Sequence, residues 1–251
     1  MALQALIFDV DGTLAETERD GHRIAFNQAF ADAGMPWSWD PATYGRLLAV
    51  TGGKERMLHH WREVDPAGAD TPEAAARIED LHRRKTAHYV RLVAEGGIGL
   101  RPGVERLLRE ARAAGMRLAI ATTTTPDNVE ALVSATLGPD AMEWFTCIGA
   151  GDAVPRKKPD PGIYAWVMER MGVAPAQCLA FEDSANGLRA ALGAGLRTVV
   201  TTGAYTHAEE FPGALALLDG LGEPGAPARG HVRGTPWSGV VDVDVLRDWA
   251  V

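Results

Sequence analysis

The sequence is poor in cysteine. Its 251 residues contain only Cys147 and Cys178, which provide no disulfide framework and do not show the paired spacing of a metal-binding motif. Chains with so few cysteines are typical of reducing compartments. We therefore expect a cytoplasmic protein, and the disulfide-rich secreted classes are excluded.

Long apolar runs and excess positive charge are also lacking. No uncharged run approaches the length of a membrane-spanning helix, and the first residues show no basic region followed by an apolar signal core. The formal net charge of -8 argues against non-specific binding to nucleic acid or to anionic membranes. An anionic substrate would have to be held by local cations and metal. We expect no nucleic-acid or membrane partner.

A buried strand that ends in two carboxylates is the most informative feature. In the stretch from Leu3 to Leu14 an apolar run leads to Asp9 and Asp11, and Gly12 then breaks the pattern. Because ligands bind at the carboxyl ends of strands in open parallel sheets, we expect a site there. Two carboxylates this close need a cation, and Mg²⁺ suits oxygen ligands. A plain turn after a strand is the alternative for this motif alone.

The order of helices and strands predicts an α/β fold, a doubly wound parallel sheet with an inserted all-helical cap. Residues 16–95 show only helical patterns, over 16–34, 41–50, 54–64 and 72–95. From residue 101 helices and strands alternate, which implies a parallel sheet. The predicted strands after the first are 117–121, 144–149, 178–181 and 198–201, and the helices are 104–114, 128–137, 161–171 and 185–194. We therefore predict a core of residues 1–15 and 96–251 and a cap of residues 16–95.

The C-terminal tail is rich in glycine and proline and has no motif. We predict a loop over residues 220–239, a short edge strand over 240–245 and a last helical turn with Leu246 and Trp249. The tail is assigned no catalytic role.

Three further pieces follow predicted strands. Thr122 and Thr123 end one strand and can offer a hydroxyl and an amide to phosphate, although threonine also suits strand ends for structural reasons. Lys158 precedes a proline and a helix, where a fixed cation is an alternative to solvated surface charge. Glu182 and Asp183 end another strand, where they can complete a magnesium site or cap the next helix.

In this order the four pieces resemble the motifs of the haloacid-dehalogenase superfamily, beginning with Asp9-Val10-Asp11-Gly12-Thr13-Leu14. The resemblance implies that Asp9 is a nucleophile that forms an aspartyl-phosphate and that Asp11 is a general acid and base. It also implies that Thr122 and the Thr123 amide bind phosphate and that Lys158 neutralises charge. Mg²⁺ would be bound by Asp9, the Asp11 carbonyl and Asp183, with Glu182 binding directly or through water.

The cap segment Thr51-Gly52-Gly53-Lys54-Glu55-Arg56 places two glycines and two cations at a helix start, where a second phosphate could bind. A simple turn with solvated charges is the alternative. With the segments 15–18 and 81–86 it resembles the CbbY-type sugar-bisphosphate phosphatases. That likeness implies hydrolysis of xylulose 1,5-bisphosphate, an inhibitor of Rubisco in the Calvin cycle. It places Glu16 on sugar hydroxyls and Gly52, Gly53 and Lys54 on the distal phosphate, with Tyr44 and Lys85 as further candidates.

His22 departs from the pattern of related caps, because the segment from Glu18 to His22 is one residue longer than the usual Glu-x-x-His. We therefore predict a histidine on the helix surface. The protein is expected to act as a monomer on a small sugar phosphate, with a functional rather than physical link to Rubisco.

The sequence leaves three rival functions. A phosphosugar mutase would use the same nucleophile, although Thr13 favours a phosphatase by family likeness. A haloacid dehalogenase needs neither Asp11 nor a metal. A non-catalytic binding protein on this fold would not require Asp9, Asp11, Lys158 and Asp183 together.

Overall fold

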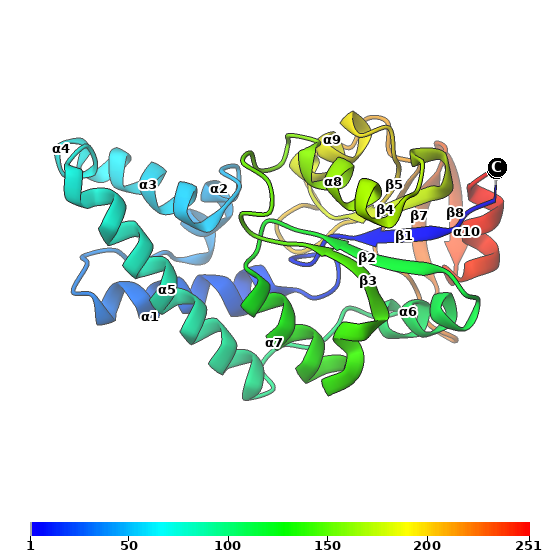
Figure 1. Ribbon diagram of the computed structural model, residues 1–251, viewed down its shortest axis with the longest axis horizontal. Coiled ribbons are helices and arrows are strands. Elements are labelled where there is room, and N and C mark those ends of the chain that lie inside the picture. Colours follow the sequence, from blue (N-terminus) through cyan, green and yellow to red (C-terminus); the bar gives the residue numbers. More distant parts are fainter. Residues whose placement is uncertain (1) are drawn as a thin grey trace.

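The computed structural model describes residues 2–251 and contains one eight-stranded sheet beside a helical arm (Figure 1). The sheet order is β3-β2-β1-β4-β5-β6-β7-β8, and the neighbours from β3 to β6 are parallel. The predicted doubly wound α/β fold is confirmed. The strands are β1 (Ala5–Phe8), β2 (Arg117–Ala121), β3 (Phe145–Gly149), β4 (Cys178–Glu182), β5 (Arg197–Thr201), β6 (Ala216–Leu218), β7 (Ala228–Val232) and β8 (Thr235–Gly239).

Strand β1 lies between β2 and β4, and all four of its residues are buried. Its side chains alternate between two apolar clusters: Leu6 and Phe8 belong to the cluster under α6 and α7, and Ala5 and Ile7 to the cluster under α8 and α9. Helices on both faces explain why this strand is apolar throughout. The core helices are α6 (Val104–Ala113), α7 (Pro126–Leu137), α8 (Gly162–Met171) and α9 (Ala185–Gly193), with short turns η2 (Pro139–Trp144) and η3 (Pro175–Gln177).

The segment between β1 and α6 is helical, and Figure 1 shows it extending away from the sheet. We call this helical segment the cap. Its interior is aromatic, with Phe26, Phe30, Trp39 and Tyr44 fully buried. Its elements are η1 (Glu18–His22), α1 (Arg23–Asp32), α2 (Pro41–Leu47), α3 (Gly53–Val64), α4 (Pro66–Ala69) and α5 (Pro72–Ala94).

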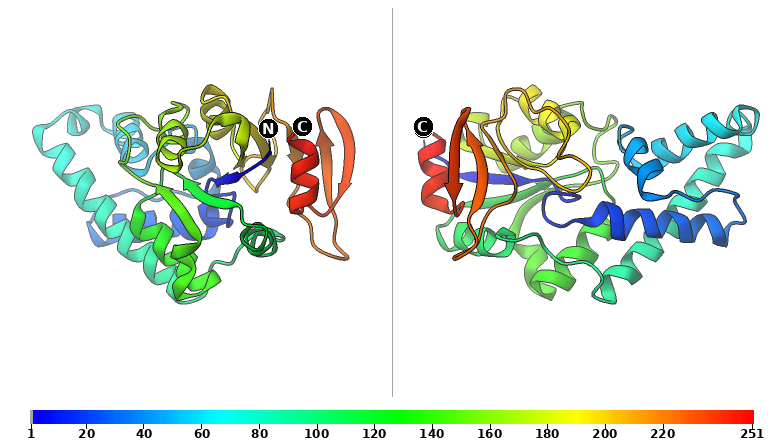
Figure 2. Two further views of the ribbon diagram at one scale, coloured as in Figure 1. Left: turned by 45° about the vertical axis from the view of Figure 1, so that its right-hand side comes forward. Right: turned by 180° about the vertical axis from the view of Figure 1, so that it is seen from behind.

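In the C-terminal tail the predicted loop and edge strand are wrong, whereas Leu246 and Trp249 are helical as predicted. Strands β7 and β8 form an antiparallel hairpin that continues the sheet, and residues 243–249 form helix α10 (Val243–Trp249), not an edge strand followed by one turn. Figure 2 shows the hairpin and α10 at the end of the molecule opposite the cap. Gly230 lies within β7, and only glycine fits there, because a Cβ would lie 2.0 Å from the Leu217 carbonyl oxygen. The Asp242 side chain accepts a hydrogen bond from the Val245 amide at 2.8 Å and so starts α10.

No helix within residues 2–251 combines the length and the apolar character that crossing a bilayer requires.

Candidate active site

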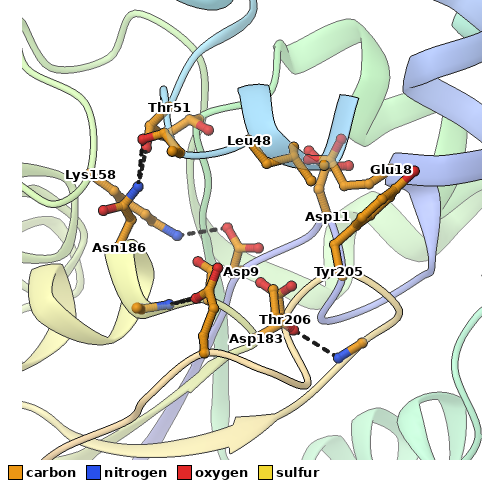
Figure 3. Close-up of a pocket in the computed structure, with 18 of the residues that line it drawn as sticks. Asp9, Asp11, Glu18, Leu48, Thr51, Lys158, Asp183, Asn186, Tyr205 and Thr206 are labelled. Carbon is orange, nitrogen blue, oxygen red and sulfur yellow. Dashed lines mark hydrogen bonds and ion pairs between the residues drawn. The ribbon is translucent and has the colours of Figure 1, made fainter. Parts of the chain in front are cut away.

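A cleft of about 240 Å³ lies where the C-terminal ends of β1 and β4 meet the cap (Figure 3). The core contributes six charged side chains to its wall, and the cap contributes residues of α2, of the turn after it and of α3. The charged core residues are Asp9, Asp11, Lys158, Asp183, Arg189 and Glu209, and the cap residues include Gly45, Leu48, Thr51 and Arg56. The parallel register that pairs Phe8 with both Ile120 and Phe181 brings the predicted motifs to one edge of the sheet.

Lys158 joins two buried carboxylates. Its Nζ donates hydrogen bonds to Asp9 Oδ1 and to Glu182 Oε1, each at 2.6 Å, and the Tyr164 hydroxyl donates to the same Glu182 oxygen. Burial, together with the charges of Glu182 and Asp11, raises the pKa of Asp9 to about 8 although Lys158 opposes the shift. Burial alone would lower the pKa of Lys158, but Asp9 and Glu182 hold it above its usual range. Asp9 therefore needs further positive charge to remain ionised at neutral pH.

The carboxylates of Asp9, Glu182 and Asp183 can hold a metal ion, because one oxygen of each lies within 4.8 Å of the others. Glu182 Oε2 is buried without a hydrogen-bond partner among residues 2–251. Burial and the charges of Asp9 and Glu182 raise the pKa of Asp183 well above its usual range. An orphaned buried oxygen and three crowded carboxylates fit a hard divalent cation.

Glycine makes room for this acidic cluster. A Cβ on Gly12, whose φ is +89°, would lie 2.1 Å from Asp183 Oδ2. The backbone of the Asp9-Val10-Asp11-Gly12 turn can thus approach Asp183 only because residue 12 has no side chain.

Asp11 is held on one oxygen. Thr17 Oγ1 donates to Asp11 Oδ1 at 2.6 Å, and His22 Nε2 lies 2.8 Å from the same oxygen. The Lys85 Nζ donates to His22 Nδ1 at 2.8 Å, so the proton on the imidazole lies on Nε2 and points to Asp11. Burial alone would raise the pKa of Asp11, but His22 and then Thr17 lower it to about 2. Asp11 is therefore an oriented carboxylate.

The prediction of a surface position for His22 is wrong, since the residue is 4% exposed and stacks on Tyr89 with ring centroids 4.2 Å apart. The extra residue before it is accommodated by the π-helix η1, in which hydrogen bonds span five residues instead of four. If residues Glu18–His22 formed an α-helix, the His22 imidazole would point away from Asp11. The wider π-helical turn directs the imidazole to Asp11 instead.

The second motif ends β2 as predicted. The Thr122 amide donates to the Gly149 carbonyl at 2.9 Å, and its buried hydroxyl accepts from the Thr124 amide at 3.2 Å. Thr123 lines the cleft.

The predicted cap residues take different positions. Glu16 lines the cleft, with its carboxylate 3.6 Å from Arg101 Nε. The fully buried Tyr44 donates its hydroxyl proton to Glu18 and accepts from Arg56 at 2.9 Å. Gly52, Gly53 and Lys85 line a smaller cavity that Asp11 also borders. Lys54 Nζ donates to Glu79 in the cap and to Asp152 in the core, each at 3.1 Å.

Three side chains of this site were assigned no role from the sequence. Thr17 and His22 hold Asp11, and Tyr164 holds Glu182. Only Thr17 lies in a segment that resembles the family, and residue type alone does not distinguish the other two from core residues. Arg56, predicted with Lys54 to bind a second phosphate, donates a hydrogen bond to the Tyr44 hydroxyl.

His82, which borders the smaller cavity, gives the protein a pH-dependent stability. Burial, followed by the charges of Lys85 and Lys54, lowers its pKa from 6.5 to about 4. The unfolded chain binds a proton below pH 6.5 while the native state does not, so stability is full above that pH and falls toward pH 4. At pH 5 the loss due to His82 is about 2 kcal/mol relative to pH 7. Urea unfolding at pH 7 and pH 5 should show a smaller loss of unfolding free energy for His82→Gln than for wild type. The exposed His207→Gln is the control and should lose as much as wild type. Identical losses in wild type and His82→Gln would contradict the role of His82.

Comparisons with known proteins agree with this geometry. The family of haloacid dehalogenase-like hydrolases matches residues 3–195. The chain is 49% identical to protein CbbY (plasmid) of Cupriavidus necator, over 98% of this chain and 96% of that protein. The crystal structure of a CbbY mutant from Rhodobacter sphaeroides in complex with xylulose-(1,5)bisphosphate is 52% identical, with a TM-score of 0.81 over 87% of this chain and 94% of that one. A phosphorylated carbohydrates phosphatase of Thermotoga maritima is 30% identical over 78% of this chain and 84% of that protein. The chain therefore belongs to the haloacid dehalogenase-like hydrolases and, within them, to the CbbY-type phosphatases.

Proposed function

We propose that this phosphatase is magnesium-dependent and releases one phosphate of a sugar bisphosphate, xylulose 1,5-bisphosphate, through an aspartyl-phosphate on Asp9. The observation that carries the proposal is the pair of carboxylates at the end of β1, Asp9 buried and Asp11 partly buried, with Lys158 fixed 2.6 Å from the first of them. The similarity to a CbbY structure that contains this bisphosphate supports the choice of substrate. The protein acts as a monomer on this small molecule, and its link to Rubisco is functional.

In the first step a carboxylate oxygen of Asp9 attacks phosphorus and the bond from phosphorus to the sugar oxygen breaks. Lys158 neutralises the nucleophile and the transferring group from one side. Magnesium held by Asp9, Asp183, the Asp11 carbonyl and Glu182, directly or through water, would keep Asp9 ionised and neutralise phosphoryl oxygens. Thr122 and the Thr123 amide bind the remaining oxygens, as the anion-binding end of β2 suggests.

Asp11 supplies and removes the protons. It protonates the departing sugar oxygen and then takes a proton from the water that attacks the aspartyl-phosphate, so it ends in its starting state. Its pKa of about 2 makes it a carboxylate in the free protein. The negative charge of a bound phosphate raises that pKa, so that Asp11 takes up a proton from solvent as the substrate binds and returns it when phosphate leaves. Thr17 and His22 occupy Oδ1, which leaves Oδ2 for the transfer.

The cap residues recognise the rest of the substrate. Glu16 binds sugar hydroxyls from the wall of the cleft, and the glycine-rich start of α3 with Lys54 binds the distal phosphate. Lys54 must exchange Asp152 for that phosphate, so distal binding breaks one ion pair between cap and core. Tyr44 and Lys85 support this surface from behind, through Glu18 and His22.

Phosphate release from a panel of sugar mono- and bisphosphates tests this function. We expect Mg²⁺-dependent release that is fastest from xylulose 1,5-bisphosphate and lost with EDTA, because the single charge of Lys158 does not balance the three carboxylates of the acidic cluster. Restoring Mg²⁺ should restore the rate. Equal rates with monophosphates would contradict the role of Lys54, and isomerised sugar phosphate in place of inorganic phosphate would indicate a mutase.

A further inference from the structure

The loop after β5, residues 203–209, belongs to the core and is fixed beside the acidic cluster. The Gly203 amide donates to Thr206 Oγ1 at 2.9 Å, and the Thr206 side chain is buried. The Ala185 amide, two residues after Asp183, donates to Glu209 Oε2 at 2.6 Å. Both bonds are drawn in Figure 3. The loop therefore keeps a fixed position relative to the metal ligands proposed above.

Tyr205 at the tip of this loop reaches the cap. Figure 3 shows its side chain extending from the loop toward Glu18, and its ring lies edge-on to Tyr44 with centroids 6.0 Å apart. Tyr205 also lines the cleft that holds Asp9. A side chain anchored in the core thus forms part of the wall against the cap.

Gly45 on α2 leaves space for this ring. A Cβ on Gly45 would lie 2.9 Å from Tyr205 Cδ1 and 3.0 Å from Cε1. Gly45 lies inside helix α2, where alanine stabilises the helix more than glycine does. Its φ is not positive, so the backbone conformation does not require a glycine. The close approach of the ring is therefore the structural reason for a glycine at this position.

The Tyr205 hydroxyl is buried and has no hydrogen-bond partner in the part of the chain that the structure describes. Burying a hydroxyl without a hydrogen-bond partner costs free energy and so disfavours this position of the Tyr205 side chain. The packing of the ring against α2 must therefore be what holds the side chain.

We propose that Tyr205 is a positioning residue that fixes the cap over the core and so sets the affinity for phosphate esters long enough to touch the cap. The inference rests on the proposed function in that the ester is taken to be a sugar phosphate. With the ring in place, the cap residues Leu48 and Arg56 stay above Asp9. A substrate that contacts the core alone gains nothing from Tyr205.

Steady-state kinetics of Tyr205→Ala test this role with two substrates. We expect the KM for the best sugar phosphate to rise about five- to tenfold, the factor that corresponds to one aromatic contact, with a smaller change in kcat. The kcat/KM for acetyl phosphate, which is too small to touch the cap, should stay near the wild-type value. Tyr205→Phe keeps the ring and should restore the KM, and exposed Glu210→Ala is the control. An equal loss in Tyr205→Phe, or equal losses with both substrates, would overturn the proposal.

Gly45→Ala tests the contact from the cap side. Alone it should raise the KM and lower the Tm, because the new methyl group meets the ring. In the Tyr205→Ala background it should leave the KM unchanged and raise the Tm, because only the helical preference for alanine remains. Additive effects on KM, or the same sign of Tm change in both backgrounds, would overturn the proposal.

Small-angle X-ray scattering measures the radius of gyration without substrate, so it tests the role of Tyr205 independently of the proposed function. Tyr205→Ala should have a larger radius of gyration than wild type, because the cap loses a tie to the core. If wild type releases phosphate from no sugar phosphate, the proposed function fails and the scattering result still decides the role of Tyr205. An unchanged radius would overturn it.

Discussion

Replacing Asp9 with asparagine is expected to reduce phosphate release by about 10⁴-fold or more, the scale on which loss of a nucleophile acts. The amide keeps the shape of the side chain but cannot attack phosphorus. Because Asp9 is buried beside Glu182 and Asp183, the neutral side chain also relieves repulsion in the cluster. The free energy of unfolding should therefore remain within about 1 kcal/mol of wild type.

Phosphate release and urea unfolding of the same Asp9→Asn sample measure both effects. Asp140→Asn, an exposed position on η2, makes the same chemical change away from the site and should leave both quantities unchanged. Retention of even one tenth of the activity by Asp9→Asn would rule out Asp9 as the nucleophile.

Lys158→Met should have the second largest effect, because it affects both activity and stability. The side chain is 5% exposed and its Nζ contacts Asp9 and Glu182 at 2.6 Å. Removing one partner of a buried ion pair leaves uncompensated charge, which costs about 3–5 kcal/mol. Loss of a fixed cation beside the transferring phosphoryl group should lower kcat by about 10²–10³-fold.

Chemical unfolding at pH 7 and phosphate release under saturating substrate are the measurements for Lys158→Met. Arg156→Met is the matched control, since its ion pair with Asp160 is 79% exposed on the arginine side and contributes at most about 1 kcal/mol. If Lys158→Met and Arg156→Met have the same free energy of unfolding, the buried ion pairs of Lys158 with Asp9 and Glu182 do not stabilise the protein.

Residues placed by strand ends were predictable from the sequence. Asp9, Thr122 and Asp183 each follow a strand, and in a parallel sheet the carboxyl ends of strands share one edge. Their position at one edge therefore follows from the parallel sheet, and the strand order that puts β1 between β2 and β4 makes them neighbours. The helical cap was predictable for a similar reason, since its apolar periodicity is local.

Residues placed by long-range packing or irregular backbone were not predictable. His22 reaches Asp11 through a π-turn that no α-helical count anticipates. The β7–β8 hairpin depends on pairing with β6, which makes Gly230 a strand residue despite its loop-forming character. Tyr205 meets Gly45 across 160 positions of sequence (205 minus 45), and only the folded chain shows why that helix has a glycine.

In the proposed reaction Asp9 becomes phosphorylated, and trapping the aspartyl-phosphate detects this step at the residue itself. Acetyl phosphate labelled with ³²P is a suitable donor, because its leaving group needs no proton and Asp11→Asn can therefore still form the intermediate while hydrolysing it slowly. After acid quenching, we predict label on the peptide that contains Asp9, with more in Asp11→Asn than in wild type and none in Asp9→Asn. Release of phosphate without label on that peptide at any time, or label on another residue, would show that Asp9 is not the nucleophile.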